Sequence, residues 1–167
     1  MTIQPATTAD IPCIVKLVNS AYRGEAGEVG WTHEGHLISG PRTQEADVAE
    51  LMRGGGVILT GWEHEELAGC VYLKKEVHRL YLGMLSVSPR HQGLGIGKKL
   101  MAAAAASAVQ QNCSVIRITV ISARGELIAW YERQGFRRTG EVEPFHEGDR
   151  FGTVKQPLEL VVLEKTV

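Results

Sequence analysis

The stretch Ser88–Leu100, SPRHQGLGIGKKL, carries three glycines at alternate positions and two lysines directly after them. It follows a predicted strand over 79–87 and opens a predicted helix over 97–111. Backbone N–H groups at the start of a helix have no intrahelical partner, and the helix dipole adds partial positive charge there. Because glycine lacks a Cβ, an anion can come close to such amides. The stretch therefore predicts a phosphate site at a strand-to-helix junction.

Two common phosphate-binding motifs do not fit this stretch. A GxGxxG dinucleotide fingerprint that begins at Gly93 needs glycine where Lys98 stands. A Walker loop needs glycine where Gln92 stands, and Ser or Thr where Lys99 stands. The pattern that fits is Q-x-x-G-x-G, from Gln92 to Gly97. The alternative is a plain turn in which the glycines only relieve backbone strain.

Length, charge and cysteine usage indicate a single soluble domain over residues 1–167. The formal net charge is −1, with 18 basic and 19 acidic residues. Such a balance gives no electrostatic reason to expect nucleic acid or an anionic membrane as a partner. The first residues lack a signal-peptide pattern, no apolar stretch is long enough to span a bilayer, and three widely spaced cysteines indicate reduced thiols. We expect a cytoplasmic protein, and a homodimer stays open.

The spacing of apolar residues predicts a mixed α/β chain with helices over the faces of a sheet. The first helix is expected to begin with a capping box formed by Thr7 and Asp10. The residues between 23 and 43 read as a loop with a short helix near Leu37. The expected elements are helices over 7–22, 44–53, 97–111 and 125–134, and strands over 57–62, 66–75, 79–87, 114–122, 136–142 and 158–165.

Two motifs together make the sequence resemble the GNAT superfamily of N-acetyltransferases. The first signature is Q/R-x-x-G-x-G/A after a strand that ends in a hydrophobic-x-Val-x-Pro pattern, here MLSVSPRHQGLGIG at 84–97. The second is YExxGF at the end of a later helix, here YERQGF at Tyr131–Phe136. The resemblance covers nearly the whole chain. It implies a single α/β (α+β) domain with a mixed, mostly antiparallel central sheet, helices on both faces and one splayed pair of parallel strands.

The resemblance also implies an acetyl-CoA site between the two splayed strands, with no metal. By position, strand backbone would bond the pantetheine arm and loop amides would hold the pyrophosphate. Arg124 stands where family members often carry Asn, so cofactor binding either loses one hydrogen bond or gains an arginine at a CoA phosphate. The implied cofactor-binding residues are Leu85, Ser86, Val87, Gln92, Gly93, Leu94, Gly95, Ile96, Gly97, Lys98 and Arg124.

Acetyl transfer to an amine requires a neutral amine and benefits from a proton donor at the departing thiolate. By the resemblance, Tyr131 fills the family position of that acid, and the alternative for an aromatic residue on a short helix is core packing. We assign the catalytic role to Tyr131 and core packing to Trp130. Thr119 stands where some members place a glutamate base, so no base is assigned.

The resemblance places the acceptor site partly at the loop after the first helix. Arg23 and Arg42 could each hold a carboxylate, and Trp31 could wall a small pocket. The acidic residues Glu25, Glu28 and Glu34 could instead attract a cationic amine, or simply form a solvated loop. The HEGH segment at 33–36 falls short of the zinc motif HExxH.

The combined reading is an acetyl-CoA-dependent enzyme that acetylates the amine of a small molecule, with Arg23 and Trp31 as substrate-binding residues. One alternative keeps the fold but acetylates a protein or peptide N-terminus. The other is a non-catalytic acyl-CoA-binding module, which would need no tyrosine at position 131.

Overall fold

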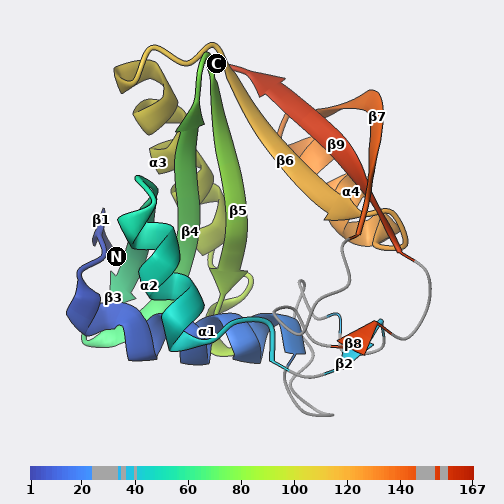
Figure 1. Ribbon diagram of the computed structural model, residues 1–167. Coiled ribbons are helices and arrows are strands. Elements are labelled where there is room, and N and C mark those ends of the chain that lie inside the picture. The colour runs from blue at the N-terminus through green and yellow to red at the C-terminus, as the bar shows by residue number, and fades with distance from the viewer. Residues whose placement is uncertain (24–33, 35–36, 40, 146–152, 155–157) are drawn as a thin grey trace.

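The computed structural model describes residues 1–23, 34, 37–39, 41–145, 153–154 and 158–167. Its helices and strands follow the chain in an alternating order (Figure 1). They are β1 (Thr2–Pro5), the 3-10 helix η1 (Thr8–Asp10), α1 (Ile11–Arg23), β2 (Ile38–Ser39), α2 (Glu45–Arg53), β3 (Val57–Glu63), β4 (Glu66–Glu76), β5 (Arg79–Val87), the 3-10 helix η2 (Pro89–His91), α3 (Ile96–Gln110), β6 (Val115–Ile121), α4 (Gly125–Arg133), β7 (Arg137–Pro144), β8 (Thr153–Val154) and β9 (Glu159–Thr166).

Seven strands form one sheet in the order β1-β3-β4-β5-β6-β9-β7, and β2 pairs separately with β8. Within the seven-stranded sheet, β5 and β6 run parallel, and the other neighbouring pairs are antiparallel. The predicted mixed, mostly antiparallel sheet with one parallel pair is confirmed.

The parallel strands β5 and β6 are paired only where they begin. Their register joins Arg79 to Val115 at one end and Tyr81 to Arg117 at the other, three residue pairs in all. Beyond that point β5 continues to Val87, and Figure 1 shows the two strands diverging. In the later part of β5, the backbone edge that faces the gap is therefore not paired with the described residues of β6.

A bulge in β5 lies within this diverging part. The register between β4 and β5 shifts between Cys70 and Tyr72, so that Met84 and Leu85 together oppose Val71. Met84 has a φ of 54°, in the left-handed region that non-glycine residues rarely take. Bulges bend a strand and increase its twist, and they are frequent beside active sites.

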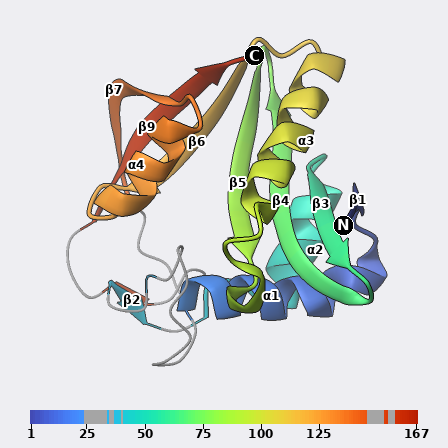
Figure 2. The same ribbon diagram turned by 180° about the vertical axis from the view of Figure 1, so that it is seen from behind.

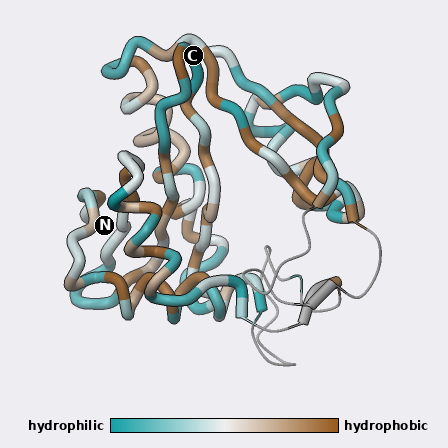
Figure 3. The backbone as a smooth tube through the Cα atoms, in the orientation of Figure 1, coloured by the Kyte–Doolittle hydropathy of each residue, from teal (hydrophilic) through white to brown (hydrophobic). Residues whose placement is uncertain are grey.

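Helices cover both faces of the sheet. Helices α1 and α2 pack on one face, and α3 and α4 pack on the other (Figures 1 and 2). Figure 3 shows hydrophobic stretches along the central strands, where the two cores meet the sheet. The α1–α2 core includes the buried residues Ile14, Val18, Val48 and Ile58. The α3–α4 core includes the buried residues Leu80, Leu100, Ile116, Ile128 and Leu163.

Most predicted elements are confirmed within a few residues of their ends. The capping box is confirmed, since the Thr7 amide donates to Asp10 Oδ2 at 2.8 Å, but it begins the short η1 rather than α1 itself. Leu37 lies in a turn before β2, so the short helix expected there is wrong. Strand β1 was not predicted from the sequence, because this four-residue edge strand owes its conformation to pairing with β3.

No disulfide, metal cluster or membrane helix occurs in the described residues. Cys13 is exposed, Cys70 and Cys113 are buried, and all three are free. Over the described ranges, no three His, Cys, Asp or Glu side chains are grouped so as to hold a metal ion. None of the helices in those ranges combines the length and apolarity needed to cross a bilayer.

Candidate active site

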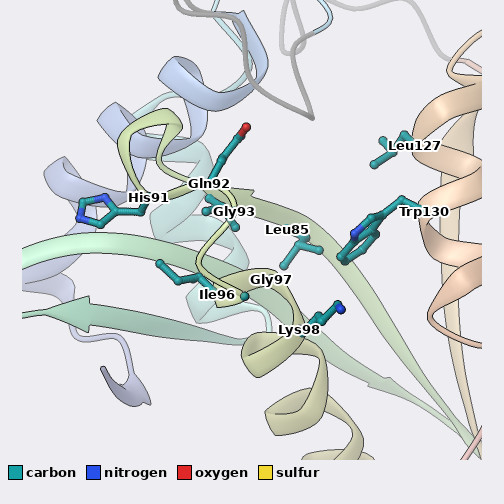
Figure 4. Close-up of a pocket in the computed structure, with 11 residues that line it drawn as sticks. Leu85, His91, Gln92, Gly93, Ile96, Gly97, Lys98, Leu127 and Trp130 are labelled. Carbon is teal, nitrogen blue, oxygen red and sulfur yellow. The ribbon is translucent and has the colours of Figure 1, made fainter.

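The glycine loop forms one wall of a pocket of about 290 Å³. Helix α4 forms the opposite wall, and Figure 4 shows its Leu127 and Trp130 facing the loop across the gap. Leu85 of β5 lies between the two walls (Figure 4). The lining residues are Leu85, Val87, His91, Gln92, Gly93, Gly95, Ile96, Gly97, Lys98, Leu127 and Trp130. We call this space the glycine-loop pocket.

The start of α3 supplies anion-binding chemistry to the glycine-loop pocket. Gly93 and Gly95 have φ values of 82° and 75°, which favour glycine, and Gly95 is the N-cap of the helix. The Lys99 amide donates to Gly95 O at 3.1 Å as the first bond of the helix. The amides of residues 96–98 therefore have no carbonyl partner within the helix. Together with the helix dipole and the Lys98 ammonium, they suit a phosphate.

Gly97 keeps the glycine-loop pocket open where α3 approaches α4. A Cβ at this position would lie 3.4 Å from Trp130 Cζ2 and 3.8 Å from Val87 Cγ2. Both neighbours line the pocket. A longer side chain at position 97 would therefore project into the space that a ligand needs.

A second pocket, of about 210 Å³, lies next to the first, because Leu127 lines both spaces. We call it the tyrosine pocket. Its walls are the end of α1, the bulged part of β5, the later part of β6 and α4. Its lining residues include Tyr22, Arg23, Glu34, Arg42, Tyr81, Thr119, Arg124, Leu127, Tyr131 and Phe145.

Tyr131 is both a packed and a pocket-lining residue. It is 5% exposed, and its ring centroid lies 5.0 Å from that of Trp130 and 5.5 Å from that of Phe136. Burial raises the pKa of Tyr131 well above its ordinary value, with Tyr22 acting in the same direction and Arg124 against it. The hydroxyl therefore stays protonated at neutral pH inside the tyrosine pocket.

A buried charge cluster lies in the tyrosine pocket. Arg23 Nε donates to Glu34 Oε1 at 2.8 Å, and Arg23 Nη2 lies 2.6 Å from the same oxygen. Arg124 Nη1 lies 3.5 Å from Glu34 Oε2. The exposed fractions of the Arg23, Glu34 and Arg124 side chains are 3%, 5% and 7%. One carboxylate therefore holds two guanidinium groups that come from opposite sides of the gap.

Side-chain hydroxyls hold the bulge of β5. Tyr22 Oη donates to Leu85 O at 2.8 Å, and Ser86 Oγ donates to Met84 O at 3.1 Å. Burial raises the pKa of Tyr22, so this hydroxyl keeps its proton. The Arg42 guanidinium lies 5.5 Å from the centroid of the Tyr22 ring, a cation–π arrangement. Tyr22 thus joins α1 to the strand segment that borders both pockets.

The structure brings together most of the residues that the sequence analysis assigned to acetyl-CoA, but not all of them. Ser86 is fully buried, Leu94 is 62% exposed, and neither lines the glycine-loop pocket. Arg124 lines the tyrosine pocket instead. Trp31 lies outside the described residues, as do Glu25 and Glu28.

Several residues that line the two pockets were not predicted from the sequence. No role was expected for Tyr22, which ends the helix predicted over 7–22, or for His91 and Leu127. An aromatic hydroxyl at the end of α1, next to the charged loop, was the available signal for Tyr22. Thr119 lines the tyrosine pocket at the position where the family resemblance led us to look for a base.

Comparisons with known proteins identify the family and its fold. The family whose sequence model matches is described as the acetyltransferase (GNAT) family, and the match spans residues 18–136. No curated protein matches the chain significantly.

Similar solved structures include the ribosomal-protein-S18-alanine N-acetyltransferase of Escherichia coli, with 15% identity, a TM-score of 0.75, and coverage of 99% of this chain and 93% of that one. The ribosomal-protein-alanine N-acetyltransferase of Brucella melitensis has 20% identity, a TM-score of 0.73 and full coverage of both chains. A GNAT family acetyltransferase from Elizabethkingia anophelis with acetyl-CoA bound has 16% identity, a TM-score of 0.68, and coverage of 99% and 97%. At these identities the likeness confirms the fold.

Proposed function

The chain belongs to the acetyltransferase (GNAT) family, and on that premise we propose that it transfers the acetyl group of acetyl-CoA to the amine of a small molecule. The observation that carries the proposal is that two chemically different pockets adjoin at a shared residue of α4. The glycine-loop pocket offers amides and a lysine to phosphate, while the tyrosine pocket offers a protonated hydroxyl, and Leu127 borders both. We take residues 1–167 as one N-acetyltransferase domain.

We place the pyrophosphate of acetyl-CoA at the start of α3, on the amides of residues 96–98 and the Lys98 ammonium. The pantetheine arm then follows the edge of β5 from Val87 to Leu85, where strand pairing with β6 has ended. This path leads the thioester past Leu127 into the tyrosine pocket. Arg124 lies in that second pocket and is ion-paired with Glu34, so we assign it to the acceptor side.

In the reaction, the neutral amine attacks the carbonyl carbon of the thioester. A C–N bond forms, the C–S bond breaks, and the Tyr131 hydroxyl gives its proton to the departing thiolate. Tyr131 holds its proton at neutral pH, as any tyrosine with a pKa of about 10 or above does, and so it can act as the donor in this step. The amine loses its own proton to solvent, since Thr119 is no base and two guanidinium groups hold the Glu34 carboxylate.

Acetylation of a protein or peptide N-terminus is the second candidate function. Two similar solved structures are named as ribosomal-protein-alanine N-acetyltransferases, which favours it. A non-catalytic acyl-CoA-binding module is less well supported, because Tyr131 lines the tyrosine pocket, which adjoins the glycine-loop pocket. A cytoplasmic location and a homodimeric state stay predictions.

The test is an acceptor screen that follows free thiol release from acetyl-CoA. Small amines, amino acids, and peptides with free N-termini are compared at equal concentration, with an acceptor-free reaction as the control for hydrolysis. We expect release with at least one small amine. Release with peptides alone would favour the second candidate, and tight acetyl-CoA binding without any turnover would favour the binding module.

A further inference from the structure

A tyrosine of β5, Tyr81, lines the tyrosine pocket from the strand side. Tyr22 of α1 and Tyr131 of α4 line the same pocket, so tyrosines from three elements border it. Tyr81 is also the last residue of β5 that pairs with β6, and its partner there is Arg117. Tyr81 therefore lies where the two strands begin to diverge (Figure 1).

Gly83 leaves room for the Tyr81 ring to lie along β5. A Cβ at position 83 would be 2.8 Å from Tyr81 Oη and 2.9 Å from Tyr81 Cε1, distances too short for a real contact. The φ of Gly83 is not positive, so the backbone itself does not require glycine. Glycine inside a strand weakens it and often marks a position that another group approaches closely. Here that group is the Tyr81 hydroxyl, which lies over the strand just before the bulge.

The Tyr81 ring is packed along one side. Its neighbour is Tyr72, which pairs with Gly83 in the β4–β5 ladder and is 6% exposed. The centroids of the two rings lie 6.3 Å apart with an angle of 65° between the planes, an edge-to-face contact. Tyr81 is itself partly buried against the α1–α2 core. This packing holds the Tyr81 hydroxyl in place at the wall of the tyrosine pocket.

The three hydroxyls of the tyrosine pocket differ in their hydrogen bonding. The Tyr22 hydroxyl donates to Leu85 O. Burial raises the pKa of Tyr131, and the nearby Tyr22 and Tyr81 raise it further, so Tyr81 acts on the group that we propose as proton donor. Among the described residues, none forms a hydrogen bond with the Tyr81 hydroxyl. Because a hydroxyl oxygen carries two acceptor lone pairs, Tyr81 is able to accept from a ligand in this pocket.

We infer that the Tyr81 hydroxyl orients the acceptor: its oxygen accepts a hydrogen bond from the N–H of the attacking amine and directs the nitrogen lone pair at the thioester carbon. The inference rests on the proposed function and makes Tyr81 an acceptor-binding residue. The covalent steps stay the same, and the amine still loses its proton to solvent. Orientation matters because attack requires the reacting atoms to lie about 3–3.5 Å apart with their orbitals aligned.

The variant Tyr81→Phe keeps the ring and removes the hydroxyl. With the best acceptor of the thiol-release screen, kcat/KM for the acceptor should fall about 5- to 100-fold, because the amine loses its hydrogen-bond partner. The KM for acetyl-CoA should change less than about twofold. The matched control is Tyr72→Phe, which should change neither value, because Tyr72 lines neither pocket and the variant keeps the ring contact with Tyr81. Normal acceptor kinetics in a folded Tyr81→Phe protein, or an equal loss in Tyr72→Phe, would overturn the inference.

A binding measurement tests the same hydrogen bond without turnover. Two thioethers of CoA carry an N-methylacetamide or an N,N-dimethylacetamide group on the sulfur, and only the first has an N–H beyond the carbonyl. Calorimetric titration gives the ratio of the two affinities. The preference for the first should fall about fivefold or more in Tyr81→Phe and persist in Tyr72→Phe.

The two experiments separate this inference from the proposed function. If the screen finds no acceptor, the proposed function fails, and the titration still decides the role of Tyr81. An affinity ratio that is the same in wild-type protein and Tyr81→Phe contradicts the inference and leaves amine acetylation standing.

Discussion

Replacing Gly97 by valine tests whether the glycine-loop pocket binds acetyl-CoA. The new Cβ would lie 3.4 Å from Trp130 Cζ2 and 3.8 Å from Val87 Cγ2, and both atoms belong to the pocket lining. The contact between the new Cβ and Trp130 Cζ2 would require at most a small shift of the Trp130 ring. The two methyl groups of valine would extend the obstruction toward the amides that begin α3.

The expected effect on folding is small and the expected effect on binding is large. Glycine inside a helix is about 0.5–1 kcal/mol less favourable than alanine, and valine lies between the two, so the free energy of unfolding should change by about 1 kcal/mol or less. A charge-assisted hydrogen bond contributes about 1.5–3 kcal/mol. Losing one such bond to the pyrophosphate would weaken acetyl-CoA binding about 10- to 100-fold.

Calorimetric titration with acetyl-CoA measures the affinity, and thermal melting checks the fold. Gly97→Ala should give a smaller loss of affinity with equal or higher stability. The matched control is Gly125→Val, at the first residue of α4, because no atom lies within 4 Å of a Cβ added there. A folded Gly97→Val protein with unchanged affinity would mean that the glycine loop is only a turn. An equal loss in Gly125→Val would point to a general loosening of the gap.

Three further outcomes follow from the tyrosines. Tyr131→Phe should lower turnover about 10²- to 10⁴-fold with little change in acetyl-CoA affinity; near-normal turnover in a folded variant would leave Tyr131 as a core residue. Tyr22→Phe removes the hydrogen bond to Leu85 O and should weaken the binding of acetyl-CoA more than the binding of CoA. The control is Tyr72→Phe in the same core, which should leave the ratio of the two affinities unchanged. An unchanged ratio in Tyr22→Phe would contradict the prediction. Burial raises the pKa of Tyr22 and Tyr131 in the folded protein. In the unfolded chain both hydroxyls ionise with the ordinary pKa of about 10, so above that pH the unfolded state gains stability relative to the folded state. Their contribution to stability is present below about pH 10 and is lost above it, and denaturant titrations at rising pH should show a shallower loss in Tyr131→Phe.

Local properties of the sequence were sufficient to predict the main helices and strands from α1 to β9, without β1 and the β2–β8 pair, and a ligand site at the glycine loop. The spacing of apolar residues is set by helix and strand geometry, so it appears in any short window. The loop needs residues without a Cβ at positions such as Gly93 and Gly95, whose positive φ values only glycine takes easily. Both signals lie within about ten residues. The structure confirms the main elements and places a pocket at the glycine loop, and the ligand of that pocket stays a prediction.

The tyrosine pocket depended on the tertiary structure. Tyr22 and Leu85 are separated by 63 positions, and Glu34 joins Arg23 to Arg124 across the gap. The order of the strands and a one-residue bulge bring these groups together, and neither has a local sequence pattern. The sequence does not show whether a charged residue lies on a solvated loop or in a buried ion pair. Only its neighbours decide between the two, since burial leaves a charge stable only beside an opposite one.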